Sequence, residues 1–544
     1  MTENLIKFLL LTIILLAGLL RFYNISNIPP ALNWDEAALG YNAYSLGIDG
    51  RDEFGKFLPI QYLESFGDFK PVVYSYLALI PVKIFGLSEF GVRFPSAIFG
   101  TLTVLLTYFL VKEIFPKKDR KTEYLALFTA FLLAISPWHI MLSRGAYEAN
   151  VSTFFIVLGV FFFLKANNKN PWYLLLSAPS FAITFYTFNT SRVFVPLFVI
   201  ALAVAFRKQL IKNWRKTILA GFLGLVLLLP LIPFLLSPQA KLRYHEVNIF
   251  SDISIIERSN QYVANDGGVF WSRLIHNRRA LYSLEFTKHY LDNFNPRFLF
   301  VTGDGNPRFS TQDVGQLYLI SLPFLIAGTF LLIRRKEGHF WILPVWFLLG
   351  IIPAATARET PHALRIETVM PTLQIITAYG FINLIFMVSN KTYQKITAGL
   401  IGAIYLFFLF YFYHGLLFHY SREYSNEWQY PYVEFVDYIE KNKDNYEQII
   451  ITEKLGRPYI YFLVYGRYDP DEFRKISSIE REAFGFVKVR ALGNYIFTED
   501  IDEESLEAGK LYVDVAENIP KGSKPIETFY YLDGKPSLIA YEKN

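Results

Sequence analysis

Long apolar segments recur along the chain from the N-terminus to about residue 418. A helix needs about 20 mostly apolar residues to cross the hydrocarbon core of a bilayer, and these segments are of that order. The pattern predicts an α-helical polytopic membrane protein with about eleven transmembrane helices. The predicted spans are residues 5–22, 95–112, 123–142, 148–164, 172–188, 190–206, 217–236, 313–333, 340–356, 367–388 and 396–418.

Lys and Arg gather in loops at every second turn of the chain. Because positively charged loops stay on the cytoplasmic side, this spacing puts the N-terminus inside and the C-terminus outside. The protein is therefore expected in the plasma membrane, with two large loops, residues 23–94 and 237–312, on the outer face. The basic loops are Lys112–Lys121, Lys165–Lys169, Arg207–Lys216, Arg334–Lys336 and Lys391–Lys395.

Two segments of these external loops are expected at the membrane surface. Residues 71–87 are apolar but contain Pro71, Pro81 and Lys83. If they crossed, the basic loops would be scattered over both faces, so a segment that lies on the surface or dips in and returns is favoured over a twelfth span. Residues 270–294 alternate apolar and polar side chains, which predicts a surface helix.

The pattern changes at about residue 425, where the long apolar runs end. Val433–Lys441 has helical character, whereas Gln448–Thr452 and Tyr459–Tyr465 have the composition of strands. We therefore expect a transmembrane domain over residues 1–424 and a small external α/β domain over residues 425–544.

Composition agrees with a membrane protein and excludes some kinds of site. Only 19% of the residues are charged, against about 25% in soluble globular proteins, and 18% are aromatic, which fits interfacial belts. The chain has no cysteine, which excludes disulfides and thiolate-bound metals. The net charge of +5 comes from short loops between spans, so no nucleic-acid partner is expected. The apolar N-terminus has no small-residue cleavage site and is expected to be an uncleaved first helix.

In this topology the unusual polar residues gather on the external face. The pair Asp35 and Glu36 follows the first span directly. A carboxylate can take a proton from an acceptor hydroxyl, and Arg or Lys can stabilise the charge on a departing phosphate, so the combination suits transfer from a lipid phosphate. The other candidates are Asp68, Lys70, Arg144, Glu148, Tyr186, Asn189, Arg192, Asp304, Asn306, Arg308, Arg358, Glu359, His362 and Arg365.

Each candidate also has a purely structural interpretation. Asp35 and Glu36 could cap a surface helix over Ala37–Leu46, because the helix dipole favours carboxylates there. The others could form local ion pairs, extend to the interface or be solvated in loops. These alternatives concern the pairs Asp68 with Lys70 and Arg144 with Glu148, then Arg192, and the loop residues His362, Arg365, Asp304 and Arg308.

Several stretches together resemble the protein O-mannosyltransferase-like branch of the GT-C glycosyltransferases, a group related to the bacterial aminoarabinose transferases that modify lipid A. The resemblance covers about residues 5–390, and the Asp-Glu pair in the first loop is its most specific part. The oligosaccharyltransferase branch is disfavoured, because its Trp-Trp-Asp motif has no match. The other stretches are Lys70-Pro71-Val72-Val73-Tyr74, Phe90-Gly91-Val92-Arg93-Phe94-Pro95-Ser96, Ser136-Pro137-Trp138-His139-Ile140 with Ser143-Arg144, and Pro361-His362-Ala363-Leu364-Arg365.

This resemblance implies a GT-C fold and an enzyme that moves a sugar from a polyprenyl-phosphate donor, with inversion, on the outer face. It implies that Asp35 is the general base and that Lys70 contacts the donor phosphate. Asp68 falls near a position that helps bind a metal in some members, but here Phe69 separates it from the Lys-Pro pair. No cofactor is therefore assigned, and a divalent metal, or a zinc site of His139, His362 and Asp68, stays an alternative.

We predict a membrane glycosyltransferase that transfers a mannose-like hexose to a protein, lipid or glycan acceptor, with membrane lipids around it. A transporter or flippase of lipid-linked sugars is an alternative, although the spans carry few internal charges. A catalytically silent scaffold is another. The predicted catalytic residues are Asp35 and Glu36, and the predicted substrate-binding residues are Asp68, Lys70, Arg144, Glu148, Tyr186, Arg192, His362 and Arg365.

Overall fold

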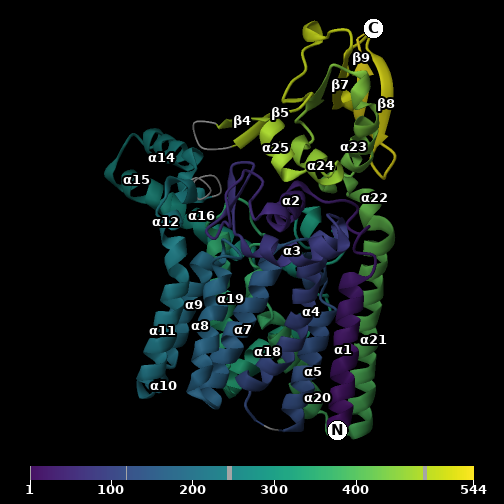
Figure 1. Cartoon of the computed structure of the whole chain (residues 1–544). Coiled ribbons are helices and arrows are strands. Elements are labelled where there is room, and N and C mark those ends of the chain that lie inside the picture. The colour runs from purple at the N-terminus through teal and green to yellow at the C-terminus, as the bar shows by residue number, and fades with distance from the viewer. Residues whose placement is uncertain (1, 118, 242–247, 482–486, 544) are drawn as a thin grey trace. The chain divides into compact units, whose positions relative to one another are not determined.

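The computed structural model describes residues 2–117, 119–241, 248–481 and 487–543, and most of them are helical (Figure 1). Internal contacts divide the chain into two compact units. The helical unit comprises Met1–Leu20, Phe99–Leu142 and Glu148–Phe412. The mixed unit, which contains helices and a sheet, comprises Arg21–Ile98, Ser143–Tyr147 and Tyr413–Asn544. The mixed unit thus combines the predicted first external loop with the C-terminal residues.

Each predicted span coincides with one or more helices, so the predicted helical membrane fold is confirmed. Five described helices are long and apolar enough to cross a membrane, and a sixth span forms if α5 and α6, bent by 53° at a short break, count as one. The other predicted spans are shorter helices, so the count of eleven crossings stays a prediction. The long helices are α1 (Glu3–Phe22), α4 (Glu89–Ile114), α7 (Glu148–Asn168), Trp214–Leu235 and Lys391–Glu423, and the bent pair is α5 (Arg120–Ala134) with α6 (Pro137–Arg144).

The shorter helices begin and end where other contacts replace the helical ladder. The predicted span at 313–333 starts only at Ser321, because the amides of Gln316 and Leu317 donate to the carbonyls of Phe298 and Leu299 instead. The shorter helices are α8 (Leu174–Thr184), α9 (Ser191–Ala205), α10 (Arg207–Lys212), α18 (Ser321–Arg335), α19 (Ile342–Ala355) and α20 (Thr372–Met387). The long segment Trp214–Leu235 contains α11 (Trp214–Leu228) and α12 (Ile232–Leu235), and the segment Lys391–Glu423 begins with α21 (Lys391–Gly415).

The second long loop is helical as well. The surface helix predicted near residues 270–294 is present as two pieces, because the Asn277 side chain caps a new helix by accepting from the amides of Arg279 and Ala280. The helices of this loop are α14 (Ile253–Asn265), α15 (Phe270–Ile275), α16 (Arg278–Asp292) and α17 (Pro296–Phe300).

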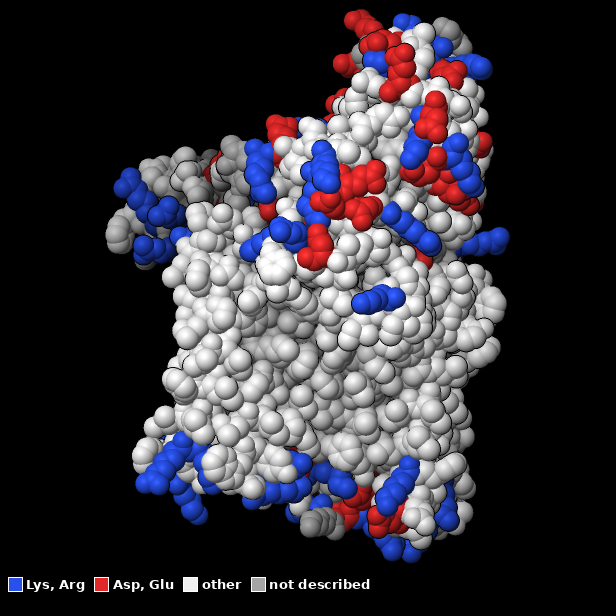
Figure 2. Space-filling view, in the orientation of Figure 1, with Lys and Arg blue, Asp and Glu red and all other residues white. Residues whose placement is uncertain are grey.

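The basic loops of the helical unit lie together at one of its ends. Lys121 and Arg335, from two different loops, both donate to the side-chain oxygen of Asn383 near the end of α20. Lys169 forms an ion pair of 2.7 Å with Glu113, which joins the loop after α7 to the end of α4. Figure 2 shows Lys and Arg at this end, where the N-terminus and α10 also lie, and beside it a surface that is almost free of charged side chains. This grouping agrees with the predicted alternation of the basic loops.

Two glycines let α18 and α20 pack at very short range. A Cβ atom on Gly328 would lie 2.0 Å from the carbonyl oxygen of Ile376, and one on Gly380 would lie 2.0 Å from that of Phe324. Small residues at helix crossings allow close backbone approach, which is a main source of packing energy between helices in a membrane.

The mixed unit begins with the first loop. It contains α2 (Trp34–Asp49), a hairpin of β1 (Leu63–Ser65) and β2 (Asp68–Lys70), and α3 (Val73–Phe85). The helix over Trp34–Asp49 includes the helix considered over Ala37–Leu46, and its place at a membrane surface stays a prediction. The ambiguous stretch at 71–87 is α3, a helix of 13 residues that packs on α2, where the Ser75 hydroxyl donates to the Leu39 carbonyl at 3.0 Å.

The C-terminal part of the mixed unit is built on a seven-stranded sheet in the described residues, with the order β4-β5-β6-β3-β7-β9-β8. The central strand β3 runs parallel to β6 and β7, and the other pairs are antiparallel. This sheet confirms the expected C-terminal sheet domain. The strands are β3 (Gln448–Thr452), β4 (Ser477–Arg481), β5 (Val487–Leu492), β6 (Tyr495–Thr498), β7 (Lys510–Val515), β8 (Lys524–Tyr530) and β9 (Pro536–Glu542).

Local predictions for this domain were partly right. The helix at Val433–Lys441 is confirmed as α23 (Pro431–Asn442), and the strand at Gln448–Thr452 is confirmed as β3. The strand predicted at Tyr459–Tyr465 is wrong, because the segment is a helix, α24 (Pro458–Tyr465). Pro458 favours a helix start, and burial of the whole run from Tyr459 to Val464 removes the alternation that would distinguish a strand.

Candidate functional site

The acidic pair lies in the first turn of α2, where Asn33 rather than Asp35 or Glu36 is the N-cap. The Asn33 side chain accepts from the amides of Asp35 at 2.9 Å and Glu36 at 3.1 Å, and Glu36 accepts in return from the Asn33 amide at 3.2 Å. This reciprocal capping box fixes the start of the helix. The amides of Asp35 and Glu36 are therefore satisfied by Asn33, and Glu36 is the N3 residue of the capping box.

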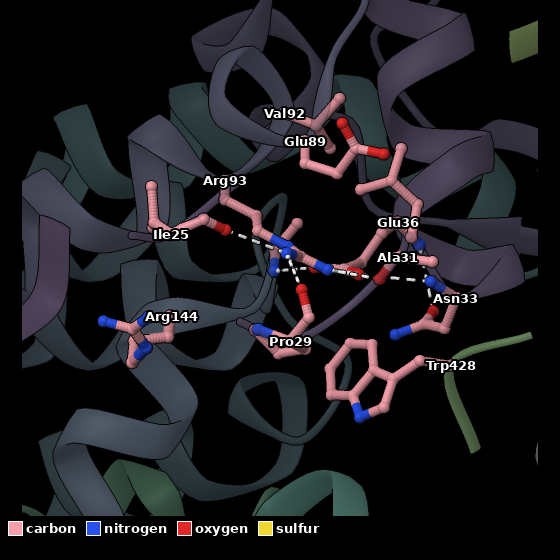
Figure 3. Close-up of polar contacts among 12 residues, drawn as sticks. Ile25, Pro29, Ala31, Asn33, Glu36, Glu89, Val92, Arg93, Arg144 and Trp428 are labelled. Carbon is pink, nitrogen blue, oxygen red and sulfur yellow. Dashed lines mark hydrogen bonds and ion pairs between the residues drawn. The ribbon is translucent and has the colours of Figure 1, made fainter. Parts of the chain in front are cut away.

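The Glu36 carboxylate is completely engaged in a buried ion pair with Arg93 (Figure 3). Both side chains are buried, and the guanidinium donates to the two carboxylate oxygens at 2.9 Å each. The amide of Ala146 donates to Oε1 of Glu36 at 2.7 Å, so with the amide of Asn33 this carboxylate accepts four hydrogen bonds. This saturation suits a positioning role better than proton transfer.

Arg93 uses every N–H group that a guanidinium has. Beyond Glu36, it donates to the carbonyls of Ile25 at 2.9 Å, Pro29 at 2.8 Å and Ala31 at 2.5 Å, and its guanidinium lies 5.4 Å from the ring centroid of Trp428. A side chain from α4 thereby fixes the segment that leads into α2.

Arg144 fixes the beginning of the same segment. Its buried guanidinium donates to the carbonyls of Tyr23 at 2.9 Å and Ile28 at 2.7 Å, with longer contacts to the carbonyls of Arg21 and Asn24. Because α6 ends at Arg144 and α7 begins at Glu148, these residues are not successive turns of one helix. The contacts of Arg144 agree with positioning of the first loop.

Asp35 is the more accessible carboxylate. Its side chain is 50% exposed, and it forms an ion pair with Lys70, whose side chain is only 7% exposed. Lys70 ends β2, and the hairpin turn before it uses Phe66 and Gly67, both with positive φ, as a tight two-residue turn requires. In the same hairpin, Asp68 accepts from the amide of Phe69 at 2.9 Å. The pair is thus held by a capped helix on one side and a hairpin on the other.

Residues from the C-terminal domain surround this hairpin. The Lys70 ammonium lies 5.8 Å from the centroid of the Phe66 ring, and the Arg457 guanidinium lies 4.7 Å from the same centroid. The ring of Tyr459 meets Phe66 edge to face at 5.8 Å. A cavity of about 410 Å³ opens in the mixed unit beside Trp34, the residue before Asp35, and is lined in part by Arg457 and Tyr459.

The buried acid Glu53 contacts Tyr459, one of the residues that line this cavity. Glu53 accepts from the hydroxyl of Tyr459 at 2.9 Å and from the side-chain amide of Asn42 at 2.7 Å. Burial raises the pKa of Glu53 to about 8, against the acidifying effect of these hydrogen bonds.

The remaining predicted residues lie in the helical unit, where the structure gives them local partners. The hydroxyl of Tyr186 donates to the Leu227 carbonyl at 2.6 Å, and Nε of Arg192 donates to the Phe185 carbonyl at 2.9 Å. Glu148 is the first residue of α7. The roles of these three side chains in substrate binding stay predictions.

His362 and Arg365 lie in a loop with Asp304. Asp304 accepts from the amide of Ala363 at 2.5 Å, and burial raises its pKa to about 6. His362 is buried against Phe309, and burial, together with Arg365 and Arg308 nearby, lowers its pKa to about 3. The guanidinium of Arg365 donates to the Glu359 carbonyl at 3.0 Å. Burial thus favours the neutral imidazole of His362, and the roles of His362 and Arg365 in substrate binding stay predictions.

The structure offers no cluster of metal ligands within the residues that it describes. No three His, Asp or Glu side chains in that part of the chain lie close enough to hold a metal ion. A zinc site of His139, His362 and Asp68 therefore has no support.

Sequence reasoning missed four residues that build this site. Arg93 could have been found as an arginine at the edge of an apolar segment, since such a charge needs a partner. The N-x-x-E spacing of Asn33 and Glu36 is a recognisable capping pattern. Arg457 and Tyr459 carry no such signal, because they reach the hairpin from almost 400 residues further along the chain.

Comparison with known proteins agrees with the expected resemblance. Residues 69–234 match the family described as dolichyl-phosphate-mannose-protein mannosyltransferase. A curated relative from Aquifex aeolicus (strain VF5), which bears the name "Uncharacterized protein", is 30% identical over 188 residues. These residues are 32% of this chain and span about a third, 34%, of that relative.

Two solved structures show the fold. ArnT from Cupriavidus metallidurans, bound to undecaprenyl phosphate, is 11% identical with a TM-score of 0.54, over 99% of this chain and 98% of that one. The Archaeoglobus fulgidus oligosaccharyltransferase, tethered to an acceptor peptide with the sequon NVT, is 14% identical with a TM-score of 0.51, over 85% of this chain and 63% of that one. The chain therefore has the GT-C fold that its sequence predicts.

Proposed function

We propose that this chain, which has the GT-C fold and matches the mannosyltransferase family over residues 69–234, is a membrane glycosyltransferase that uses a polyprenyl-phosphate-linked sugar. The observation that carries the proposal is the pair of Asp35 and Lys70, a half-exposed carboxylate on a nearly buried ammonium. The description of the family favours a mannose-like hexose, and the predicted topology favours the outer face of the membrane.

The ion pair explains how substrate binding can activate the base. In the proposed reaction, a phosphate oxygen of the donor takes the place of the Asp35 carboxylate at Lys70, because a phosphate is the stronger anionic partner for an ammonium. The displaced carboxylate loses its cationic partner, which raises its basicity. It is then able to accept a proton from an acceptor hydroxyl.

The transfer itself is a single displacement. The acceptor oxygen forms a bond to the anomeric carbon, its proton passes to Asp35, and the bond from the anomeric carbon to the phosphate oxygen breaks. The electron pair of that bond leaves with the polyprenyl phosphate, whose developing charge Lys70 stabilises. Attack opposite to the leaving group inverts the anomeric configuration. Glu36, Arg93 and Arg144 keep the segment around Asp35 in place.

The helical unit has an apolar groove of its own that suits a lipid chain. An apolar groove of about 530 Å³ runs along α8, α9 and α11, and Phe181, Val199 and Leu225 are among its lining residues. Its wall is almost entirely apolar, as a polyprenyl chain requires.

Transfer from a radiolabelled polyprenyl-phosphate mannose in purified membranes tests the proposal. Asp35→Asn is expected to lower transfer by about 10²- to 10⁴-fold, the usual contribution of a general base, while binding of polyprenyl phosphate persists. Lys70→Met is expected to weaken that binding. Asp471→Asn, which changes an exposed carboxylate of the same unit, is the matched control and should transfer normally. Undiminished transfer by Asp35→Asn would show that Asp35 is not the base.

A further inference from the structure

The cavity beside Trp34 lies next to the proposed base but is distinct from the Asp35–Lys70 pair itself. Its volume of about 410 Å³ falls within the range of small-molecule sites, which is about 300–1,000 Å³. All of its lining residues belong to the mixed unit, from the first turn of α2, the loop after β3, the start of α24, the strand β5 and the residue after β6. It therefore brings a surface of the C-terminal domain to the residue that precedes Asp35.

The walls of this cavity are held firmly. Gly456 lies so close to Trp34 that a Cβ atom there would be 2.9 Å from the indole, and its φ of +119° strains any other residue. The turn that contains it is anchored where the amide of Glu453 donates to the Thr498 carbonyl at 2.7 Å. On the other side, Tyr459 is fixed by its bond to Glu53 and by its contact with Phe66.

The polar groups of the cavity are of both signs. Glu453 and Glu499 supply acceptors, and Arg457 and Lys488 supply donors, so two acidic and two basic side chains give a formal net charge of zero. Lys488 and Glu499 form an ion pair of 2.6 Å, and Arg457 also contacts the ring of Phe66, on which Lys70 lies. Partial burial raises the pKa of Glu453.

This combination identifies a class of ligand. An aromatic ring beside paired donors and acceptors suits a polyhydroxylated ring, which presents C–H groups on its face and hydroxyls at its edge. A lipid chain would need apolar walls, and an anionic head group would need an excess of positive charge. An extended peptide would need a free strand edge, whereas β5 and β6 are paired with each other and β6 also with β3.

We propose that this cavity is the acceptor site and that it binds a neutral sugar ring of a glycan, whose hydroxyl is presented to Asp35. The proposal rests on the proposed glycosyltransferase function and names the acceptor class for it. Trp34 forms the platform for the sugar ring, and Glu453, Glu499, Arg457 and Lys488 bond its hydroxyls. Trp34 and Asp35 are successive residues of one capped helix, which couples occupation of the cavity to the base.

The experiment uses the full-length protein in nanodiscs, with labelled polyprenyl-phosphate mannose as donor. A panel of neutral manno-, gluco- and galacto-oligosaccharides, a Ser/Thr-rich peptide and an anionic glycolipid serve as acceptor probes. Glu499→Trp fills the cavity from its exposed rim, and Lys488→Ala removes a donor. Glu527→Trp is the matched control, since Glu527 is exposed on the distant edge strand β8 of the same sheet.

Transfer to at least one neutral oligosaccharide is expected, with its KM raised about tenfold or more by Glu499→Trp and by Lys488→Ala. Binding of polyprenyl phosphate, which the proposed function places at Lys70, is the readout that separates loss of the acceptor site from loss of the fold, and Glu527→Trp should match the wild type in both measurements. An unchanged acceptor KM in both cavity variants overturns the proposal, as does transfer only to the peptide or the glycolipid. Failure of the proposed base is a separate result, because it would appear as full activity of Asp35→Asn whatever the cavity variants do.

Discussion

Two adjacent carboxylates, Asp35 and Glu36, are expected to respond in opposite ways to the same chemical change. Glu36→Gln removes the negative charge that balances the buried guanidinium of Arg93, and it places amide hydrogens against a group that can only donate. Removing one partner of a buried ion pair costs about 3–5 kcal/mol. That is a large part of the total of about 5–15 kcal/mol that stabilises a typical folded protein.

Asp35→Asn should cost much less. Half of the Asp35 side chain is exposed, and an asparagine keeps an oxygen that can accept from Lys70. Pairs that are partly in solvent contribute about 0–1 kcal/mol. The structure therefore separates the two positions by about 2–5 kcal/mol in stability, with Glu36 as the sensitive one.

Thermal unfolding in detergent, followed by size-exclusion of the protein that stays soluble, measures this difference. For a folded unit of this size, 1 kcal/mol corresponds to about 2–4 °C in Tm, so Glu36→Gln should lower Tm by about 6–20 °C and Asp35→Asn by less than about 4 °C. Transfer activity should show the reverse order of sensitivity per folded molecule. Equal losses of Tm in the two variants, or a Glu36→Gln protein as stable as the wild type, would refute the assignment of a structural role to Glu36.

Three other predictions follow from single residues. Arg93→Lys should lower Tm almost as much as Arg93→Ala. The guanidinium donates five hydrogen bonds, whereas an ammonium has only three donors. A Tm of Arg93→Lys within about 2 °C of the wild type would contradict this prediction. The folded-state pKa of Glu53 is raised to about 8, above its unfolded value of 4.5, so the folded protein binds the extra proton and loses stability as pH rises from about 5 to about 8. The Tm of Glu53→Gln relative to wild type should therefore increase over that interval, and a constant difference would argue that Glu53 does not titrate there. Gly328→Ala should lower the yield of folded protein in fluorescence-detected size exclusion, because the added Cβ atom meets the backbone of α20. Gly399→Ala is the control and should not lower the yield, because the space around Gly399 is open. Equal yields would show that α18 and α20 separate easily.

Much of the architecture was accessible from the sequence because it depends on local composition. Apolar runs predict which segments lie in lipid, and basic loops predict which side of the membrane a loop occupies. The helices of the structure coincide closely with the apolar runs. The Tyr459–Tyr465 segment shows where this reasoning fails. A short run that is buried on every side has no periodicity to read, so its helical state depends on the packing around it.

The site was predictable only in part. Asp35 and Lys70 could be proposed from their residue types and their positions in one loop. The division of labour between Asp35 and Glu36 could not, because it depends on Arg93, which lies 57 residues further on, and on an amide 110 residues away. No local sequence pattern indicates that the Glu36 carboxylate already accepts four hydrogen bonds. The same applies to the cavity, whose walls are shared between Trp34 and residues beyond 450.

The mixed unit also imposes an order on biosynthesis. Glu64 in the hairpin is held by Arg481 through bonds of 2.6 and 3.1 Å, and Glu53 by Tyr459, across separations of 417 and 406 residues. Those partners leave the ribosome only after the predicted spans, the last of which ends at residue 418, have been made. Glu53 and the hairpin therefore lack these partners until Tyr459 and Arg481 have been made. Under the proposed function, a chain that ends before Tyr459 is therefore expected to lack transfer activity.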